Sequence, residues 1–233
     1  MIVTDDISQL PRTWYHGTSS LHIDSFNRKG ISVNSGRRKS DFGRGFYLTS
    51  NWEQAYRWAK SACKREKAVN PHKELFPIIV ECEVFTEAFR ELDYKIFTET
   101  DIEWAHFILE NRTIQETIAY NMKDNLFNPE LKGLSSYEEE TLIQMGATSS
   151  PYHCIYGPMA DGRNLRLYLE RVKRGKMTHD EFLKSVTSIK YKFPISHQLS
   201  INTDEATHYV QMRGVFNIAK GIWQQPVRSR EAQ

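Results

Sequence analysis

Hydrophobic and polar positions alternate in several short stretches of the chain, and this alternation is typical of β-strands. Residues 77–85 form the longest such stretch and are rich in isoleucine and valine. Shorter stretches cover residues 14–16, 45–49 and 152–156, and residues 191–201 also have an extended pattern. The first of these strands is expected to end in a polar turn at residues 17–20. The pattern thus predicts strands spread over most of the chain.

Other stretches follow the period of an amphipathic helix. Ser50 followed by Glu53 matches a capping box and predicts that a helix begins there. The apolar face of this helix would contain Trp52, Ala55, Ala59 and Cys63.

Four more helices are predicted from capping residues and breakers. Residues 164–174 should form a helix that ends at Gly175. Asp101 and Thr203 are N-cap candidates for two short helices, and Thr178 with Glu181 forms a second capping box. The inward side chains of that last helix would be Phe182, Leu183, Val186 and Ile189.

The mixture of strands and helices lacks regular β-α-β order, so we predict an α+β fold. Residues 1–224 are expected to form a single domain, followed by a flexible tail at residues 225–233. Residues 113–150 are acidic and polar in patches, and we interpret them as a helical insertion. Residues 27–40 are rich in Gly, Ser, Arg and Lys and should form a mobile loop.

Composition excludes several classes of protein. The 233 residues are 39% hydrophobic, as in globular proteins, and the mean hydropathy of -0.58 without a long apolar run argues against a membrane span. The first residues lack the pattern of a secretory signal. Cys63, Cys82 and Cys154 are scattered and odd in number, which argues against a disulfide framework and a zinc site. We expect a cytoplasmic protein with neither metal nor membrane contact.

Common catalytic motifs are absent from the sequence. There is no Walker loop, no G-x-S-x-G, no H-E-x-x-H and no C-x-x-C. The turn formed by Gly43, Arg44 and Gly45 has only two glycines and does not match the dinucleotide-binding fingerprint. The reaction classes that these motifs mark are therefore not supported.

Two segments on either side of the predicted loop form the most informative combination. They are residues 15–18, Tyr-His-Gly-Thr, and residues 41–49, Asp-Phe-Gly-Arg-Gly-Phe-Tyr-Leu-Thr, which a helix follows directly. In this combination the chain resembles the ADP-ribosyltransferase superfamily, in the branch of diphtheria toxin and the poly(ADP-ribose) polymerases. It is more similar still to a bacterial family of uncharacterised proteins assigned to that superfamily. Shared features are Trp104 with residues 111–112, Gly-Pro-Met-Ala-Asp at residues 157–161, and residues 198–203.

The resemblance covers about residues 13–211, apart from the insertion. It implies a split β-sheet, mixed and antiparallel, with flanking helices, and NAD as co-substrate. Cleavage of the nicotinamide–ribose bond gives the sugar oxocarbenium character, as in glycoside hydrolysis. The protein must therefore hold nicotinamide as a leaving group and bring an acceptor to the anomeric carbon.

The resemblance also assigns roles to individual residues. The backbone of Gly17 would bind the carboxamide of nicotinamide, because a side chain there would block close approach. His16 would bond the adenosine ribose, and Thr18 would support the same turn. Tyr47 would stack on nicotinamide, with Trp58 as a second ring on the following helix. Arg44, between the two glycines, completes the expected NAD-binding residues.

The third catalytic position of the family, a glutamate in members that form polymers, is Gln198 here. Glutamine can bond a ribose hydroxyl but supplies no negative charge, so we expect a single transfer rather than chain elongation. His16, Tyr47 and Gln198 are thus the expected catalytic residues. Glu205 lies nearby in sequence and is an alternative source of a carboxylate.

We predict a mono-ADP-ribosyltransferase that modifies a protein or a nucleic acid. The alternatives are an NAD glycohydrolase, and a catalytically silent module that binds NAD or nucleic acid. By analogy with bacterial relatives, an intracellular toxin of a toxin–antitoxin or antiphage system, with an antitoxin partner, is expected. Candidate acceptor-binding residues are Arg37, Arg38, Lys39, Asp161 and Arg163.

Overall fold

The structure is a computed structural model. It describes residues 3–33, 40–101, 103–108, 110–111, 151–160, 165–187 and 196–225. The expected insertion, the expected tail from residue 226 and residues 34–39 of the expected mobile loop lie outside this range. The described residues form two β-sheets and several helices, so the predicted α+β class is confirmed.

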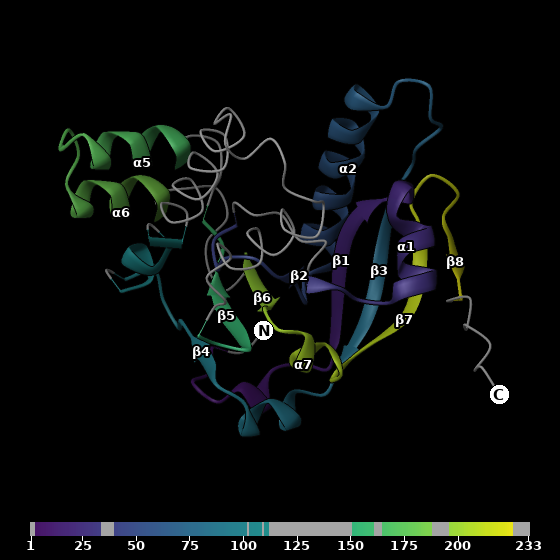
Figure 1. Cartoon of the computed structure of the whole chain (residues 1–233), viewed down its shortest axis with the longest axis horizontal. Coiled ribbons are helices and arrows are strands. Elements are labelled where there is room, and N and C mark those ends of the chain that lie inside the picture. Colours follow the sequence, from purple (N-terminus) through teal and green to yellow (C-terminus); the bar gives the residue numbers. More distant parts are fainter. Residues whose placement is uncertain are drawn as a thin grey trace, which may run out of the picture.

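The first of two four-stranded sheets is antiparallel throughout. Its order is β1 (Thr13–Ser19), β3 (Pro77–Val84), β7 (Val210–Asn217) and β8 (Ile222–Gln224). In Figure 1 these strands lie on the right of the molecule. β3 is the predicted strand at residues 77–85, whereas β7 and β8 were not predicted. β1 is longer than predicted: Gly17, Thr18 and Ser19 pair with β3, so the polar turn expected there is wrong.

The second sheet is mixed. Its order is β2 (Phe46–Leu48), β6 (His197–Ile201), β5 (Cys154–Pro158) and β4 (Tyr94–Ile96). β4 pairs with β5 in parallel, and the other pairs are antiparallel. β2 and β6 fall within predicted stretches. β5 overlaps the strand predicted at residues 152–156 but continues two residues further, to Pro158, and β4 was not predicted.

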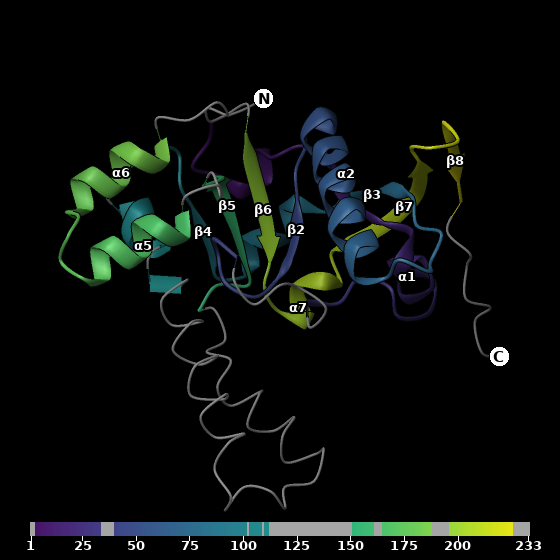
Figure 2. The ribbon, with the colours of Figure 1, turned by 90° about the horizontal axis from the view of Figure 1, so that it is seen from above.

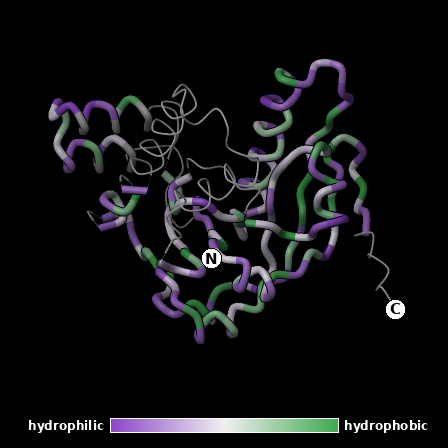
Figure 3. Tube along the Cα trace, in the orientation of Figure 1, coloured by the Kyte–Doolittle hydropathy of each residue, from purple (hydrophilic) through white to green (hydrophobic). Residues whose placement is uncertain are grey.

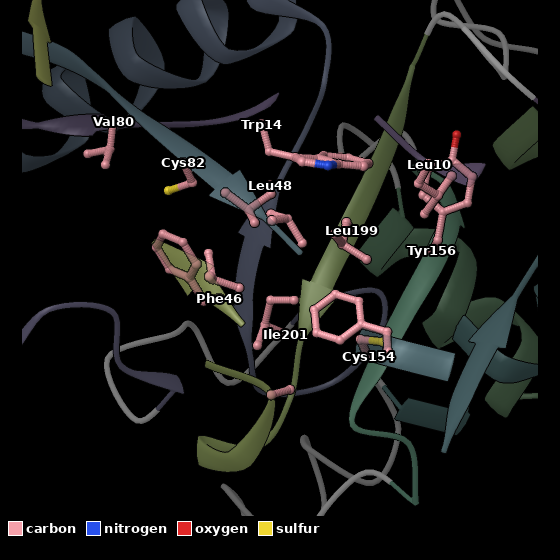
Figure 4. Packing of buried hydrophobic residues seen from close by; sticks show 14 of the residues in the cluster. Leu10, Trp14, Phe46, Leu48, Val80, Cys82, Cys154, Tyr156, Leu199 and Ile201 are labelled. Atoms are coloured by element: carbon pink, nitrogen blue, oxygen red, sulfur yellow. The ribbon is translucent and has the colours of Figure 1, made fainter. Parts of the chain in front are cut away.

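The main hydrophobic core lies between the two sheets. Trp14 is fully buried, and its ring stands edge-on to that of Tyr156 on β5, with 6.0 Å between centroids. Figure 4 shows Trp14, Leu48 and Leu199 gathered between strands of both sheets. In the first sheet, Figure 3 shows strongly hydrophobic residues along β3, whereas β1 is less hydrophobic. Because side chains alternate along a strand, every strand except β8 gives one face to this core.

Helix α2 (Trp52–Val69) covers β1 (Figure 1). Ala55, Ala59 and Cys63 are buried on it, as predicted. Its N-cap is Asn51, whose side chain accepts from the backbone N–H of Gln54 at 3.2 Å. The predicted N-cap, Ser50, is wrong by one residue.

The remaining helices lie around the sheets. They are η1 (Ile7–Gln9), η2 (Ser20–His22), α1 (Ile23–Lys29), η4 (Thr86–Glu91), α5 (Leu165–Lys173), α6 (His179–Thr187) and α7 (Asp204–Thr207). Figures 1 and 2 both place α5 and α6 at the opposite end of the molecule from β8. No helix in the described part of the chain combines the length and apolar character that a membrane crossing requires.

Three predicted N-terminal caps and one predicted helix end are confirmed. Thr178 and Glu181 exchange backbone and side-chain hydrogen bonds at the start of α6, as a capping box requires. Thr203 caps α7, and the side chain of Asp101 accepts from the backbone N–H of Trp104 at 2.8 Å. Gly175, which has a positive φ of 64°, follows α5 as predicted.

Candidate functional site

Strands β1 and β2 part after a single antiparallel pair. Tyr15 and Thr49 form that pair, and their backbone groups exchange hydrogen bonds of 2.8 and 3.0 Å. In antiparallel strands the N–H and C=O of every second residue point to the same edge. The backbone N–H and C=O of Gly17 therefore point toward β2, like those of Tyr15. In the same way, the backbone N–H and C=O of Tyr47 point toward β1, like those of Thr49. We call this place, between Gly17 and Tyr47, the β1–β2 split.

Gly17 presents an unpaired backbone at the split. The residue is buried, and in the described part of the chain no hydrogen bond reaches its N–H or C=O. Buried backbone groups nearly always have partners, so a buried N–H and C=O without one indicate a position where a ligand can bind.

The structure gives a reason of its own for the missing side chain of Gly17. A Cβ there would lie 2.0 Å from the backbone oxygen of Ala55 and 2.7 Å from the backbone nitrogen of Ala59. It is the backbone of α2 that requires glycine, on the face of β1, whereas the free N–H and C=O lie at its edge. Gly17 thus allows α2 to pack closely on β1 and also lies at the open edge of β1.

His16 closes one side of the split. Its Nδ1 lies 2.8 Å from the backbone oxygen of Tyr47, so the imidazole takes the place of a strand partner. Its ring lies against that of Phe46, with 4.5 Å between centroids, and farther from that of Phe26. The position of His16 is therefore fixed by contacts with β2 and α1.

The ring of Tyr47 lies on the other face of β2. Phe46 and Leu48 belong to the core between the sheets, whereas Tyr47 packs on a second cluster around Phe42. Its hydroxyl donates to the backbone oxygen of Gly43 at 2.7 Å and accepts from the N–H of Phe42 at 3.0 Å. Burial raises the pKa of this hydroxyl far above its usual range, and the charge of Asp41 adds to the shift. Tyr47 therefore stays neutral and holds the turn before β2.

Gln198 lies on β6 and is hydrogen-bonded to the carboxylate of Asp41. Its Nε2 donates to Oδ2 of Asp41 at 2.9 Å, and both residues are 4% exposed. The same Oδ2 accepts from the backbone N–H of Ala160 at 2.9 Å. Asp41 thus connects the turn before β2, strand β6 and the segment that follows β5.

The three predicted catalytic residues come from neighbouring strands, but their side chains do not meet. His16 contacts the backbone of Tyr47 rather than its ring. Tyr47 and Gln198 share one face of the second sheet, because Tyr47 pairs with Ser200, two residues from Gln198.

The other predicted NAD-binding residues lie on β1, in the turn before β2 and on α2. Thr18 is buried in β1, and Arg44 is half-buried in the turn before β2. Trp58 is half-buried one turn after Gln54, whose side chain bonds both backbone groups of His197. Trp58 therefore lies near the side of α2 turned toward the second sheet. In the described part of the chain it makes no contact with another aromatic ring.

Sequence reasoning missed two polar residues that hold this region together. Asn202 donates to the backbone oxygens of Phe42 and Arg44, at 2.9 and 3.0 Å. His197 is fully buried, and its Nε2 accepts from the backbone N–H of Ser50 at 3.1 Å. His197 precedes Gln198 directly and Asn202 follows it by four residues, but a lone histidine or asparagine carries no motif that would have singled it out.

Glu205 is not part of the site. It is exposed on α7, at the opposite end of β6 from Gln198, and its carboxylate lies 3.1 Å from His153 Nε2. The predicted acceptor residues Arg37, Arg38, Lys39, Asp161 and Arg163 lie outside the described residues. Among the described residues, no group of three or more His, Cys, Asp or Glu side chains could hold a metal ion.

Comparison with known proteins places the chain in a family but gives no activity. No curated protein and no solved structure matches it significantly. A family model described as "Protein of unknown function (DUF3990)" matches residues 13–212, which include both sheets up to β7 and every residue of the β1–β2 split. The chain therefore belongs to the DUF3990 family.

Proposed function

We propose that the protein is an NAD-dependent mono-ADP-ribosyltransferase of ADP-ribosyltransferase-like fold. The observation that carries the proposal is the β1–β2 split, where a buried glycine offers an N–H and a C=O without partners beside His16 and Tyr47. A primary carboxamide has one acceptor and two donor positions in a plane, and it can pair with such a strand edge as another strand would. Nicotinamide carries this group.

The proposed reaction breaks the bond between the anomeric carbon and the nicotinamide nitrogen. Its electron pair leaves with nicotinamide, which becomes neutral, and the ribose carries positive charge in the transition state. An oxygen or nitrogen of the acceptor then bonds to the anomeric carbon and loses its proton. The residues around the split would act by holding the leaving group and the sugar in place, since they include no free acid for the leaving group.

Individual residues would divide this work. Gly17 would bind the carboxamide, and the rings of Tyr47 and Trp58 would flank the pyridine. His16 would bond a ribose hydroxyl, and Gln198 would bond the ribose next to the reacting carbon. The acceptor is a protein or a nucleic acid, and a role as a cytoplasmic toxin or antiphage effector with an antitoxin partner is part of the proposal.

The first test is release of nicotinamide from NAD by the purified protein. Tyr47→Ala should lower the rate by about tenfold to hundredfold, because stacking of an aromatic ring on a base contributes about 1–3 kcal/mol. Tyr47→Phe keeps the ring and should retain most of the activity. Trp223→Leu, on half-exposed β8, is the control and should leave the rate unchanged. A wild-type protein that releases no nicotinamide would refute the proposal.

The acceptor class follows from a second measurement. NAD labelled in its adenosine part is incubated with the protein and cell extract, and the products are treated with nuclease or protease. Loss of the label after nuclease treatment identifies a nucleic acid as the acceptor, and loss after protease treatment identifies a protein. Nicotinamide release without macromolecular label would show that water is the acceptor, as in a glycohydrolase. Binding of NAD without release would support the silent module.

A further inference from the structure

The bond between Asp41 and Gln198 fixes which way the Gln198 amide points. A carboxylate can only accept hydrogen bonds, so the atom that lies 2.9 Å from Asp41 Oδ2 must be the amide nitrogen. The amide oxygen is then directed away from Asp41 and is available as an acceptor. An ionised glutamate at this position could not make the same bond, because two carboxylates would face each other. Members of the superfamily that form polymers have a glutamate where this chain has Gln198. In this chain a neighbouring residue, Asp41, supplies a carboxylate next to that position.

The charge of Asp41 lies close to the proposed reaction site. Asp41 and Gln198 are both 4% exposed, so water screens their interaction poorly. The field of Asp41 also reaches the hydroxyl of Tyr47, whose pKa it helps to raise. Oδ2 of Asp41 accepts hydrogen bonds from the Gln198 amide and from the N–H of Ala160. The site thus contains the negative charge of Asp41, which is hydrogen-bonded directly to residue 198.

We infer that Asp41 is a positioning residue for nicotinamide release, which orients the Gln198 amide oxygen toward a ribose hydroxyl and supplies the negative charge that glutamine lacks. This inference rests on the proposed function. In the transition state the positive sugar is stabilised by the Gln198 oxygen and, through the amide, by the Asp41 carboxylate. A glutamate at position 198 and the Asp41–Gln198 pair are two solutions to the same electrostatic requirement.

Three variants separate orientation from charge in the nicotinamide-release assay. Asp41→Asn keeps an acceptor for Gln198 but removes the charge, so kcat should fall about tenfold to hundredfold with little change in KM. Gln198→Glu places two buried carboxyls together, one of which must hold a proton, so its rate should fall as pH rises from 5 to 8. The double variant Asp41→Asn with Gln198→Glu reverses the roles of donor and acceptor. At pH 8 it should recover at least about tenfold over Gln198→Glu.

The pH dependence of the free energy of unfolding tests the same charge interaction without an activity assay. In Gln198→Glu one carboxyl has its pKa raised above its unfolded value, so the free energy of unfolding should fall, relative to wild type, as pH rises above about 4. The double variant should lose this pH dependence. Thr203→Ala removes the cap of α7 at the other end of β6 and is the matched control. It should lower stability without altering either pH profile.

The outcomes distinguish the inference from the proposed function. Wild-type release of nicotinamide that Asp41→Asn leaves unchanged would overturn the role of Asp41 and leave the function standing. No release by the wild-type protein would overturn both. If the free energy of unfolding of Gln198→Glu followed that of wild type at every pH, the charge of Asp41 would not act on residue 198. This result would also overturn the inference.

Discussion

At the scale of single residues, Gly17 serves two neighbours at once. Its Cα side lies against the backbone of α2, and its N–H and C=O lie at the open edge of β1. A methyl group would affect the helix first, because only the helix occupies the space where it would project. Fold and candidate site therefore depend on the same missing side chain, for different reasons.

Gly17→Ala should be strongly destabilising. The added Cβ would lie 2.0 Å from the Ala55 oxygen, so α2 must move away from β1. Overpacking of this kind costs about 1–3 kcal/mol, and contact with backbone puts the expected loss at the upper end. Urea denaturation measures it. Gly175→Ala is the control: it meets no atom within 4 Å and costs only the strain of a left-handed φ, about 1–2 kcal/mol. Equal losses in the two variants would contradict the close packing of α2.

At the scale of elements, the start of α2 shows where the sequence pattern was ambiguous. Ser50, Asn51 and Glu53 offer two possible caps, and the Ser–Glu spacing matched the capping box. In the structure the hydroxyl of Ser50 lies 2.8 Å from His197 Nε2, a partner 147 residues away. Asn51 is then left to cap the helix. A long-range contact, which no local pattern contains, decided between two acceptable caps.

The same limit explains the error at the end of β1. Gly17, Thr18 and Ser19 have turn-forming composition, yet all three pair with β3. β3 is long enough to pair with them, and α2 covers the Gly17 face. The second capping box, Thr178 with Glu181, was predicted correctly because α6 begins without a competing tertiary partner for either side chain among the described residues.

The two caps of α2 can be told apart by substitution. Asn51→Ala should cost about 1 kcal/mol, because the N–H of Gln54 loses its acceptor. Glu53→Ala should cost less than about 0.5 kcal/mol, since Glu53 is exposed and the N3 position is occupied by Gln54. Thermal unfolding of the two variants checks the order. A larger loss for Glu53→Ala would restore the predicted capping box.

At the scale of the whole molecule, the resemblance placed the key segments better than it placed their side chains. It predicted that residues 15–18, residues 41–49 and Gln198 come together, and they lie on three neighbouring strands. It did not predict that His16 would contact the Tyr47 backbone, or that Asp41 would bind Gln198. Motifs record which segments approach, whereas the face that each side chain takes depends on strand register, which only the folded pairing sets.

One core joins the two sheets, and Trp14 lies at its centre. The ring is fully buried and contacts Tyr156 and His197, both on the second sheet. Trp14→Ala should therefore cost about 3–5 kcal/mol, while Trp223→Ala, which is half exposed, should cost about 1 kcal/mol.

Because both sheets contribute to this core, they should unfold together. Urea denaturation followed by far-ultraviolet circular dichroism and by tyrosine fluorescence should give coincident transitions in wild type and in Trp14→Ala. Two separated transitions would mean that the sheets are independent units. The β1–β2 split would then join two bodies that move relative to each other, and a site that needs His16 and Gln198 held at fixed positions could not be preorganised for cleavage of NAD.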